Sequence, residues 1–343
     1  MKVLIIGGSG NISTAITRYL VERGEDVTIY NRNADKNIEK TLNCKHIFGD
    51  RTDFLRFEAS IKEAGNFDCV IDMICYHPPE AESDLRAFMG HVGQFIFCST
   101  VDVYAKPALF YPVREKAERR ANPAFEYAYH KILCEQIFER GRDEGFPLTV
   151  IRPAATYNDT WCPLPLIGSG QALLKRIRQG RPVIVLGNGQ SLWVSSHRDD
   201  TARAFANAVG NPKVVGHAYH VTGEEWMTWE GYYQTVVRVM QAPPLNPVFI
   251  PARLLARMVP KAASWSDWNF QYNNIFDNSA AHSDLDFRYT ITWEEGVRRM
   301  VKYQDAKGTI DTAMDNPLYE KIVDTWLQME KQVVDAILPF DAG

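Results

Sequence analysis

Short apolar runs alternate with amphipathic stretches through the first half of the chain. The runs are rich in Val, Ile and Phe, as buried strands of a parallel sheet are, and they occupy residues 3–6, 26–30, 46–50, 67–74 and 94–98. Apolar residues three or four positions apart, the spacing of one helix face, occur over residues 12–20, 54–61, 80–89 and 127–139. Strand and helix in alternation predict an α/β fold with a Rossmann-type doubly wound parallel sheet.

The pattern changes beyond residue 160. A helix over 200–209 and a strand over 216–221 are expected to return to the main sheet. Aromatic residues over 265–272 either stack on a sugar or base or pack in a core, and core packing is the commoner case. We therefore expect a dinucleotide-binding domain over residues 1–160 plus roughly 196–224, and a smaller C-terminal α/β substrate-binding lobe over roughly 161–195 and 225–330.

The first apolar run ends in a glycine turn, Gly7-Gly8-Ser9-Gly10, and a helical pattern starts directly after it. Such a turn sets a diphosphate against a helix N-terminus, where backbone N–H groups and the helix dipole attract negative charge. Glycine is needed because a side chain would occupy the space of the phosphates. In the spacing Gly7-x-x-Gly10-x-x-Ser13 a serine replaces the third glycine, for which the sequence offers no reason. The cofactor contacts predicted here are Gly7, Ser9, Gly10, Asn11 and Ile12.

The ends of the second and third runs should meet the adenosine part of the cofactor. An acidic residue after the second run would bind the ribose hydroxyls and repel a 2′-phosphate, but this chain has Asn31 followed by Arg32. We therefore expect NADP, with NAD as the alternative. A solvated loop position for Arg32 is the competing interpretation. Asp50 is expected at the adenine edge, with Arg51 beside it as a further cofactor contact.

Tyr127 and Lys131 are four residues apart on an expected helix, so both side chains leave the same face. A tyrosine with a reference pKa of about 10 is a poor base near neutral pH, and a nearby ammonium lowers that pKa by favouring the phenolate. The hydroxyl of Thr100, after the fifth run, is expected to fix the substrate oxygen. These groups could move a proton while hydride passes to or from a nicotinamide. A surface Tyr/Lys pair is the competing interpretation.

Together these motifs resemble those of the extended short-chain dehydrogenases/reductases, the NAD-dependent epimerase/dehydratase superfamily. The resemblance rests on Gly7-x-x-Gly10, Ser99-Thr100…Tyr104, Tyr127-x-x-x-Lys131, Arg152-Pro153…Tyr157, Gly187-Asn-Gly189, Ser196-His197-Arg-Asp199-Asp200, Ser283-Asp-Leu-Asp-Phe287 and Thr292-Trp-Glu-Glu-Gly296. It covers the chain to about Tyr303. Asn158 departs from the pattern, in which a glycine usually follows the tyrosine.

The resemblance implies roles for individual residues. Tyr127 would be the acid/base, Lys131 the partner that binds the ribose and lowers the phenol pKa, and Thr100 the catalytic hydroxyl. Ser99 and Pro153 would line the nicotinamide side, and Ile74 and Cys75, at the end of the fourth run, are expected to contact the cofactor. The implied activity is NAD(P)-dependent oxidoreduction or epimerisation at a hydroxyl or ketone of a sugar or sugar nucleotide. Residues 80–89 and 127–139 would form a two-fold four-helix interface, so a homodimer is expected.

Two other functions stay open. Sugar-nucleotide dehydratases of the superfamily have a Thr-Asp-Glu triplet after the fifth strand, whereas this chain has Thr100-Val101-Asp102, so the pair of groups for losing water is incomplete. The second is a non-catalytic nucleotide- or RNA-binding protein, because an atypical branch that includes chloroplast stem-loop RNA-binding proteins can lack the tyrosine–lysine pair. The resemblance to that branch rests on Tyr30-Asn-Arg32, Gly49-Asp-Arg51, Asp72-Met-Ile-Cys75 and Phe276-Asp-Asn-Ser279.

Composition narrows these choices. The net charge of −4 and the pI near 6.1 disfavour a protein built to hold nucleic acid. The six cysteines contain no C-x-x-C pair and no metal-ligand spacing is visible, so neither a disulfide framework nor a metal site is predicted. Cys69, Cys75 and Cys98 lie in apolar runs and are predicted to be core residues. Without a visible signal peptide or membrane span, a soluble cytoplasmic protein is expected.

Overall fold

The structure, a computed structural model, describes residues 1–32, 43–161, 163–164 and 167–341 and divides into two units. Unit 1 comprises Met1–Tyr157, Val194–Glu224 and Ile275–Ile291, and unit 2 comprises Asn158–Trp193, Glu225–Asn274 and Thr292–Gly343. Segment 275–291 lies in the range expected for the second lobe but belongs to unit 1. The Asp200 carboxylate holds its end there by accepting the N–H groups of Thr290 at 2.8 Å and Ile291 at 2.9 Å.

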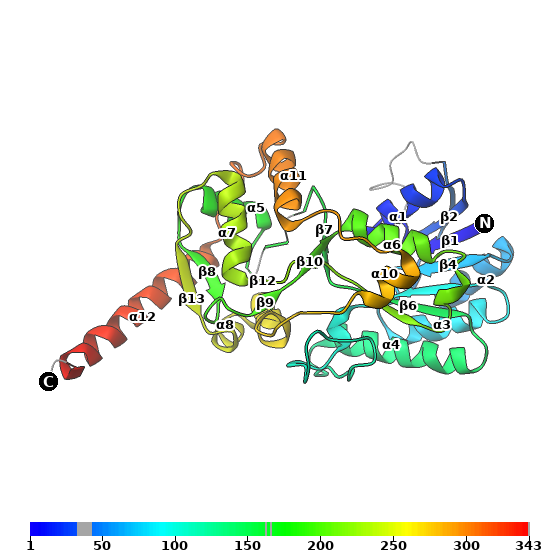
Figure 1. Ribbon diagram of the computed structural model, residues 1–343, viewed down its shortest axis with the longest axis horizontal. Coiled ribbons are helices and arrows are strands. Elements are labelled where there is room, and N and C mark those ends of the chain that lie inside the picture. The colour runs from blue at the N-terminus through cyan, green and yellow to red at the C-terminus, as the bar shows by residue number, and fades with distance from the viewer. Residues whose placement is uncertain (33–42, 162, 165–166, 342–343) are drawn as a thin grey trace. The chain divides into compact units, whose positions relative to one another are not determined.

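A parallel sheet of seven strands forms the centre of unit 1 (Figure 1). Its strands are β1 (Lys2–Ile6), β2 (Asp26–Asn31), β3 (Lys45–Phe48), β4 (Cys69–Asp72), β5 (Phe95–Cys98), β6 (Leu148–Pro153) and β11 (Ala218–Val221). All neighbours run parallel in the order β11-β6-β5-β4-β1-β2-β3. The predicted doubly wound sheet is therefore confirmed. The order reverses between β1 and β4, and in such sheets ligands bind beside this point, at the carboxyl ends of the strands.

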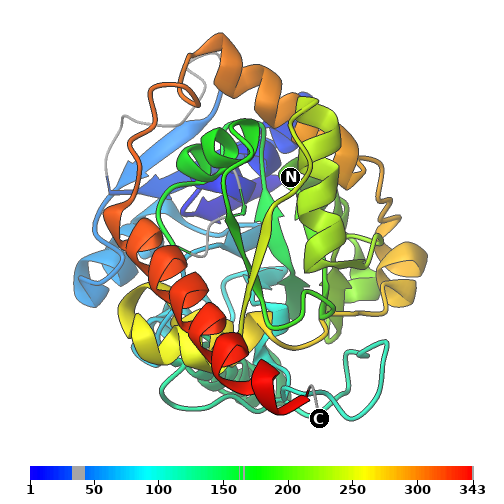
Figure 2. The same cartoon turned by 90° about the vertical axis from the view of Figure 1, so that its left-hand side faces the viewer.

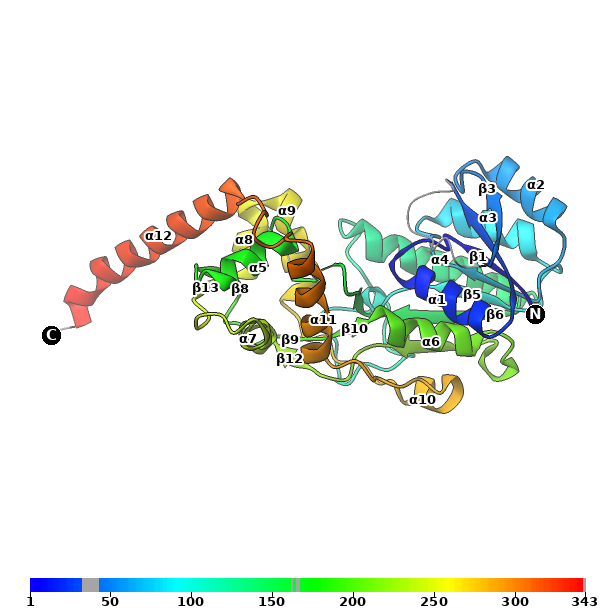
Figure 3. The same cartoon turned by 90° about the horizontal axis from the view of Figure 1, so that it is seen from above.

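Helices cover both faces of this sheet (Figure 3). The side chains of β1 alternate between the faces: Val3 and Ile5 enter one apolar core, and Leu4 and Ile6 enter the other. The first core contains residues of α1 (Asn11–Glu22), α6 (Arg198–Ala208) and α10 (Ser279–Leu285). The second contains residues of α2 (Phe54–Ala64), α3 (Pro78–Phe88) and α4 (Glu126–Asp143). Because both faces are covered, Val3 to Ile6 can be apolar throughout.

Strand β4 is shorter than its apolar run, which predicted a strand over residues 67–74. It ends at Asp72, whose Oδ1 accepts the N–H groups of Ile74 at 2.7 Å and Cys75 at 2.9 Å. Because these N–H groups bond to the carboxylate, they are not available to a neighbouring strand, and the chain turns at this point. Ile74 and Cys75 therefore lie on a loop.

Short ladders and helices build unit 2. β8 (Val183–Leu186) pairs in parallel with β13 (Pro247–Ile250), and β9 (Leu192–Trp193) pairs antiparallel with β12 (Met227–Thr228). The helices are α5 (Gly170–Arg178), α7 (Trp229–Met240), α8 (Ala252–Met258), α9 (Pro260–Trp265), α11 (Trp293–Ala306) and α12 (Pro317–Asp341). A third ladder, between β7 (Ala155–Tyr157) and β10 (Ser195–His197), belongs to unit 1.

Helix α12, drawn in red in Figure 2, lies in a part of the chain where the sequence predicted no element. It packs only through its first turns. Tyr319, Ile322 and Val323 are buried in one apolar cluster with residues of β8 and β13. From residue 327 to residue 341 every side chain is exposed. This end of the helix therefore makes no buried contact within the described part of the chain.

The aromatic residues of unit 2 form a core. Trp193 and Trp229 stack with ring centroids 4.9 Å apart, and Phe270 meets both rings edge-on. Tyr232 and Trp293 stack at 3.8 Å. Within the aromatic segment 265–272, Phe270 therefore packs in a core, as predicted.

The cysteines that the structure describes are free thiols. Cys69 and Cys75 are fully buried and Cys98 is nearly so, which confirms them as core residues. Cys162 lies outside the described residues. A search of the described helices finds none that combines the length and the apolar character needed to span a bilayer.

Candidate active site

The glycine turn after β1 leaves no room for side chains. Gly7 has a φ of +82°, and a Cβ on it would lie 2.4 Å from Cγ2 of Ile74. A Cβ on Gly8 would lie 2.5 Å from Cγ2 of Ile29. The turn leads into α1, whose first N–H groups have no partner within the helix. This backbone cradle suits a diphosphate, and it places Ile74 beside the turn.

Ser13 stands where a third glycine was expected, and the structure gives the reason. Its hydroxyl donates to the Gly7 carbonyl at 2.6 Å and accepts the Gly10 N–H at 2.7 Å. One buried side chain therefore ties the two ends of the turn together and holds the start of α1. Because Ser13 occupies the Gly10 N–H, the donors for an anion are the N–H groups from Asn11 onward, including that of Ile12.

The turn is also anchored on its far side. The Asn11 amide donates to the Thr156 carbonyl at 2.8 Å, which fixes the first residue of α1 to β7. Ser9, next to Gly10, is partly buried on the turn. The predicted diphosphate contacts are thus all placed along one short backbone segment.

Polar residues after β2 and β3 lie close together. Gly49 donates its N–H to the Asn31 carbonyl at 3.1 Å, which joins the two strand ends. The Asp50 carboxylate accepts the Thr52 N–H at 2.9 Å and the Thr52 hydroxyl at 2.7 Å. These bonds lower the pKa of Asp50, and the charge of Arg32 adds to the shift. Arg32 and Asp50 are exposed neighbours, as a site for the adenosine part of a cofactor requires.

Arg51 does not lie where the cofactor prediction placed it. Its side chain is 4% exposed, and Nη2 lies 2.7 Å from Asp84 Oδ2 and 3.2 Å from Asp72 Oδ2. It also donates to the Glu80 carbonyl at 2.8 Å. The prediction for Arg51 is wrong because the side chain turns inward to the carboxylates of β4 and α3, so we assign it a structural role.

Asp72, Cys75 and Asp84 are the one group of described residues whose ligand atoms come close enough together to hold a metal, within 4.8 Å of one another. The guanidinium of Arg51 already supplies positive charge to both carboxylates. Burial raises the pKa of the Cys75 thiol, as does its hydrogen bond with Cys134. The buried Cys75 thiol therefore belongs to this cluster, and the predicted cofactor contact could come only from its backbone.

Lys131 holds its ammonium at the carboxyl ends of β4 and β5. Nζ donates to the carbonyl oxygens of Cys75 at 2.8 Å and Cys98 at 2.7 Å, and it lies 4.7 Å from the ring centroid of Tyr76. An ammonium has three N–H groups, so one stays available beyond these two bonds. The lysine is therefore fixed beside the switch point of the sheet, where a ribose is expected to bind.

Thr100 and Tyr127 are joined by a side-chain hydrogen bond. Burial raises the pKa of the Tyr127 phenol well above its usual value, the Asp102 charge raises it further, and the bond with Thr100 lowers it. The sequence predicted a lowered pKa, and this direction is wrong. The reason is that the phenol is desolvated while the Lys131 ammonium points at two backbone carbonyls. Tyr127 therefore keeps its proton at neutral pH.

Asp102 is paired with a cation. Its Oδ1 lies 3.0 Å from Nζ of Lys106, and its Oδ2 accepts the Thr100 hydroxyl at 3.3 Å. Burial lowers the pKa of the Lys106 ammonium, and the Asp102 carboxylate opposes that shift. Asp102 thus orients Thr100 from within an ion pair.

Sequence reasoning missed Glu135, a fully buried carboxylate on α4. It accepts the Ser99 hydroxyl at 2.6 Å, two N–H groups of Arg152 at 2.8 and 2.7 Å, and one of Arg119 at 2.5 Å. Burial alone would raise the pKa of Glu135, but the two guanidinium groups hold it below its usual value. The available signal was its position four residues after Lys131, on the same helix face.

A buried network continues from Arg152 to His220. Arg152 donates to the Tyr104 hydroxyl at 2.6 Å, and that oxygen lies 2.6 Å from Nε2 of His220. Nδ1 of His220 lies 3.0 Å from the Asp277 carbonyl, so this nitrogen carries the proton. Burial lowers the pKa of His220 to about 3, and the imidazole is neutral. Because Asp277 belongs to segment 275–291, the network also explains why that segment joins unit 1.

The remaining predicted residues lie at adjacent strand ends. Ser99 follows β5 and donates its N–H to the Ile151 carbonyl at 2.8 Å, and Pro153 is the last residue of β6. The structure thus assembles the glycine turn, Ile74, Lys131, Thr100 and Tyr127 around the carboxyl ends of the central strands. Among the predicted contacts, only Arg51 and the thiol of Cys75 point elsewhere.

The sequence has relatives of known description. The model of the NAD dependent epimerase/dehydratase family matches residues 3–222. The chloroplast stem-loop binding protein of 41 kDa b of Arabidopsis thaliana is 29% identical over 243 residues, 67% of this chain and 61% of that protein, so the match spans less than two thirds of the relative. The 2′-dehydrokanamycin reductase of Streptomyces kanamyceticus is 25% identical over 281 residues, 81% of this chain and 77% of that protein.

Solved structures agree on the fold. UDP-glucose 4-epimerase of Thermotoga maritima, determined with UDP-glucose, superimposes with a TM-score of 0.70 at 19% identity and covers 90% of this chain and 99% of that one. UDP-glucuronic acid 4-epimerase of Bacillus cereus, in complex with NAD, gives a TM-score of 0.68 at 16% identity with the same coverage. At such identities the likeness concerns the fold alone.

Replacing Ser13 tests its role in the turn. We expect Ser13→Ala to lower the free energy of unfolding by about 1–2 kcal/mol, because the buried Gly7 carbonyl and Gly10 N–H both lose a partner. Urea denaturation followed by circular dichroism measures the change. Ser60→Ala is the control, since the Ser60 hydroxyl bonds to its own helix at the surface. Equal losses in the two variants would contradict the assignment.

The depressed pKa of His220 predicts acid sensitivity. Unfolded histidine takes up a proton near pH 6.5, whereas folded His220 does so near pH 3, so the unfolded state binds the extra proton between these values. The free energy of unfolding should therefore fall by about 1.4 kcal/mol per pH unit as the pH drops below 6.5. Denaturant titrations from pH 6.5 to pH 5 measure this slope. His220→Gln should flatten it and exposed His217→Gln should not; the same slope in all three proteins would refute the prediction.

Proposed function

Because the chain belongs to the NAD dependent epimerase/dehydratase family, we propose that it is an NAD(P)-dependent oxidoreductase that reduces a ketone of a sugar-like substrate. The observation that carries the proposal is the hydrogen bond between Thr100 and Tyr127 with Lys131 fixed at the neighbouring strand ends. Unit 1 would bind the dinucleotide and unit 2 the substrate. Epimerisation by the same three groups is the alternative.

Tyr127 is the general acid in this proposal. Its raised pKa keeps the phenol protonated at neutral pH, so it can donate to the carbonyl oxygen as that oxygen gains negative charge. The Thr100 hydroxyl would hold the same oxygen by turning its proton from Asp102 to the substrate. The Lys131 ammonium would bind the ribose of the cofactor. A bound nicotinamide supplies the hydride.

NADP is the cofactor that we propose, with NAD as the alternative. The glycine turn fits a dinucleotide, because it leads directly into the N-terminus of α1, where backbone N–H groups without a partner in the helix attract a diphosphate. Exposed Arg32 suits a 2′-phosphate, and the residue before it is the neutral Asn31. Asp50 would then face the adenine.

The reductive direction has two supports. Because burial raises its pKa, the Tyr127 phenol is protonated at neutral pH, which is the form that donation to a carbonyl needs. One relative is named as a reductase of 2′-dehydrokanamycin. Loss of water would need a free base after β5, and the ion pair of Asp102 with Lys106 leaves none there, so we do not favour a dehydratase.

An RNA-associated protein is the second candidate, because one relative is named as a stem-loop binding protein. The net charge of −4 speaks against it. A binding protein has no physical need for the buried Lys131 beside the Thr100–Tyr127 pair. We also propose a homodimer formed through α3 and α4.

Tyr127→Phe tests the general acid. It should reduce turnover at least about 100-fold, because the phenylalanine has no proton to donate, while the affinity for the cofactor changes little. NADPH oxidation with a panel of keto sugars and fluorescence titration with NADPH measure the two effects. Tyr129→Phe, two residues along the same helix, is the control and should remain active. Unchanged turnover of Tyr127→Phe would remove Tyr127 from the mechanism.

Arg32→Ala tests the cofactor preference. If Arg32 binds the 2′-phosphate, the substitution should weaken NADPH binding roughly 10-fold or more and leave NADH binding nearly unchanged, since an ion pair with a phosphate is lost. Isothermal titration calorimetry with both nucleotides provides the comparison. Arg56→Ala, a similarly exposed arginine on α2, is the control. Equal weakening of both nucleotides would remove the preference for NADP.

A further inference from the structure

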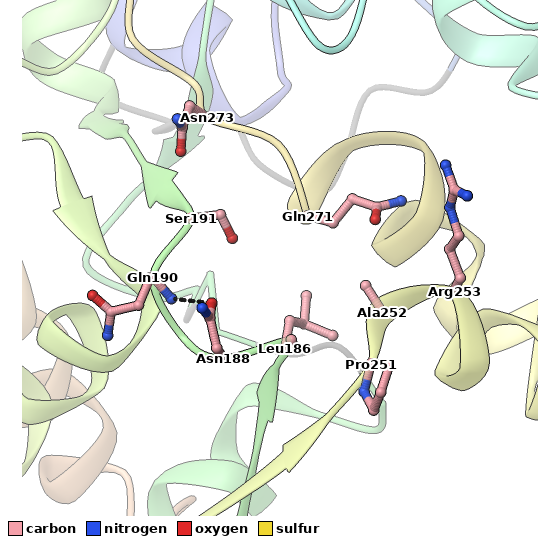
Figure 4. A pocket seen from close by; sticks show the side chains of 10 residues that line it. Leu186, Asn188, Gln190, Ser191, Pro251, Ala252, Arg253, Gln271 and Asn273 are labelled. Carbon is pink, nitrogen blue, oxygen red and sulfur yellow. Dashed lines mark hydrogen bonds between the residues drawn. The ribbon is translucent and has the colours of Figure 1, made fainter.

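Unit 2 contains a hollow of about 500 Å³ at the carboxyl ends of β8 and β13 (Figure 4). This volume lies in the range of small-molecule sites. Asn188, Ser191 and Asn273 stand on one side of it, and Gln271 and Arg253 stand on the other. Leu186 and Ala252 add an apolar floor. The wall is thus mostly neutral amide and hydroxyl groups.

The glycine turn of this hollow is not an anion site. The Gly187 N–H donates to the Ile250 carbonyl at 2.8 Å, and the Gly189 N–H donates to the Leu186 carbonyl at 2.9 Å. The Gln190 N–H is donated to Oδ1 of Asn188 at 3.1 Å. A phosphate at a glycine turn is held by free backbone N–H groups, and these three are already used.

None of the described residues that line the hollow is a free cation. Arg253 is the charged residue in its lining, and Nε of Arg253 lies 3.4 Å from Oδ1 of Asp267. The Arg253 side chain is 75% exposed and sits at the rim, where it also hydrogen-bonds to Tyr272. A diphosphate carries two charges and would find one compensated guanidinium.

Side-chain amides offer hydrogen bonds instead. Oδ1 of Asn188 and Oδ1 of Asn273 each accept a backbone N–H, from Gln190 and from Leu192, so each amide keeps its nitrogen as a donor. Gln271 donates its own nitrogen to Asp267 at 2.6 and 2.8 Å, which directs its carbonyl oxygen away as an acceptor. The backbone thus fixes the orientation of donors on one side and an acceptor on the other.

We propose that this hollow binds an uncharged polyhydroxylated ring, such as a glycoside or a cyclitol, and does not bind the diphosphate of a nucleotide sugar. Such a ring has hydroxyl groups at its edge for the amides and C–H groups on its face for Leu186 and Ala252. The inference rests on the proposed function, because it names the substrate class of the proposed reductase: a keto sugar or keto-cyclitol without a nucleotide.

The test is ligand binding to the full chain, which does not require turnover. Saturation-transfer NMR and calorimetry with methyl glucopyranosides and myo-inositol, compared with UDP and UDP-glucose, measure the preference. We expect the uncharged ligands to bind and the nucleotides to show no binding at unit 2. The substitution Gln271→Ala should weaken binding roughly 10-fold, because it removes the oriented acceptor from the wall.

Two controls separate the outcomes. Arg253→Ala should leave glycoside binding unchanged, whereas it would weaken a phosphate ligand; Gln234→Ala, an exposed glutamine on α7, should have no effect. Nucleotide binding that Arg253→Ala weakens, or absence of binding by every uncharged ligand, would overturn the proposal. The Tyr127→Phe variant should bind the glycosides as the native chain does. Retained binding with no turnover in the native chain would disprove the catalytic proposal and leave this one standing.

Discussion

The carboxylate of Glu135 is the contact on which the geometry of the candidate active site depends. This single buried charge joins α4 to the end of β5 through Ser99, to β6 through Arg152, and to the segment before α4 through Arg119. Removing one partner of such a buried pair leaves the others as uncompensated charges, which is strongly destabilising. Since α4 also carries Tyr127, the candidate acid, and Lys131, the lysine proposed to bind the ribose, the same bonds fix the positions of both side chains relative to the strand ends.

Burial gives the site its protonation pattern. Desolvation keeps the phenol of Tyr127 protonated and the imidazole of His220 neutral, whereas the carboxylates that stay charged have cationic partners. Asp102 also has a cationic partner, Lys106. The Tyr127 phenol therefore holds a proton that it could transfer to the candidate substrate oxygen.

Local patterns in the sequence were enough for the sheet and for most of the candidate site. Each apolar run and each glycine turn is encoded within a few residues, so the doubly wound order and the positions of Thr100 and Lys131 could be predicted. Side-chain contacts between residues that are far apart in the chain could not be predicted. Asp50 and Arg51 are adjacent in sequence, yet one side chain is exposed and the other turns into the interior toward carboxylates on later elements.

The direction of the Tyr127 pKa was predicted wrongly for a related reason. Helical spacing places Lys131 on the same helix face as Tyr127. It does not predict that two backbone carbonyls bind the Lys131 ammonium instead of the phenol. Segment 275–291 likewise joins unit 1 through hydrogen bonds with Asp200 and His220, and no local sequence pattern predicts these bonds. Glu135 is the exception, because its spacing from Lys131 was visible and was overlooked.

The hydroxyl of Ser13 has a consequence for how long a cofactor stays. It occupies the Gly10 N–H, so a diphosphate in the turn has one backbone donor fewer than an all-glycine turn would offer. An enzyme that recycles its cofactor in place benefits from binding it tightly. An enzyme that consumes reducing equivalents must instead exchange the spent dinucleotide in every cycle. A turn that competes with its own ligand for a hydrogen bond favours exchange, which the proposed reduction requires in every cycle and an epimerase does not.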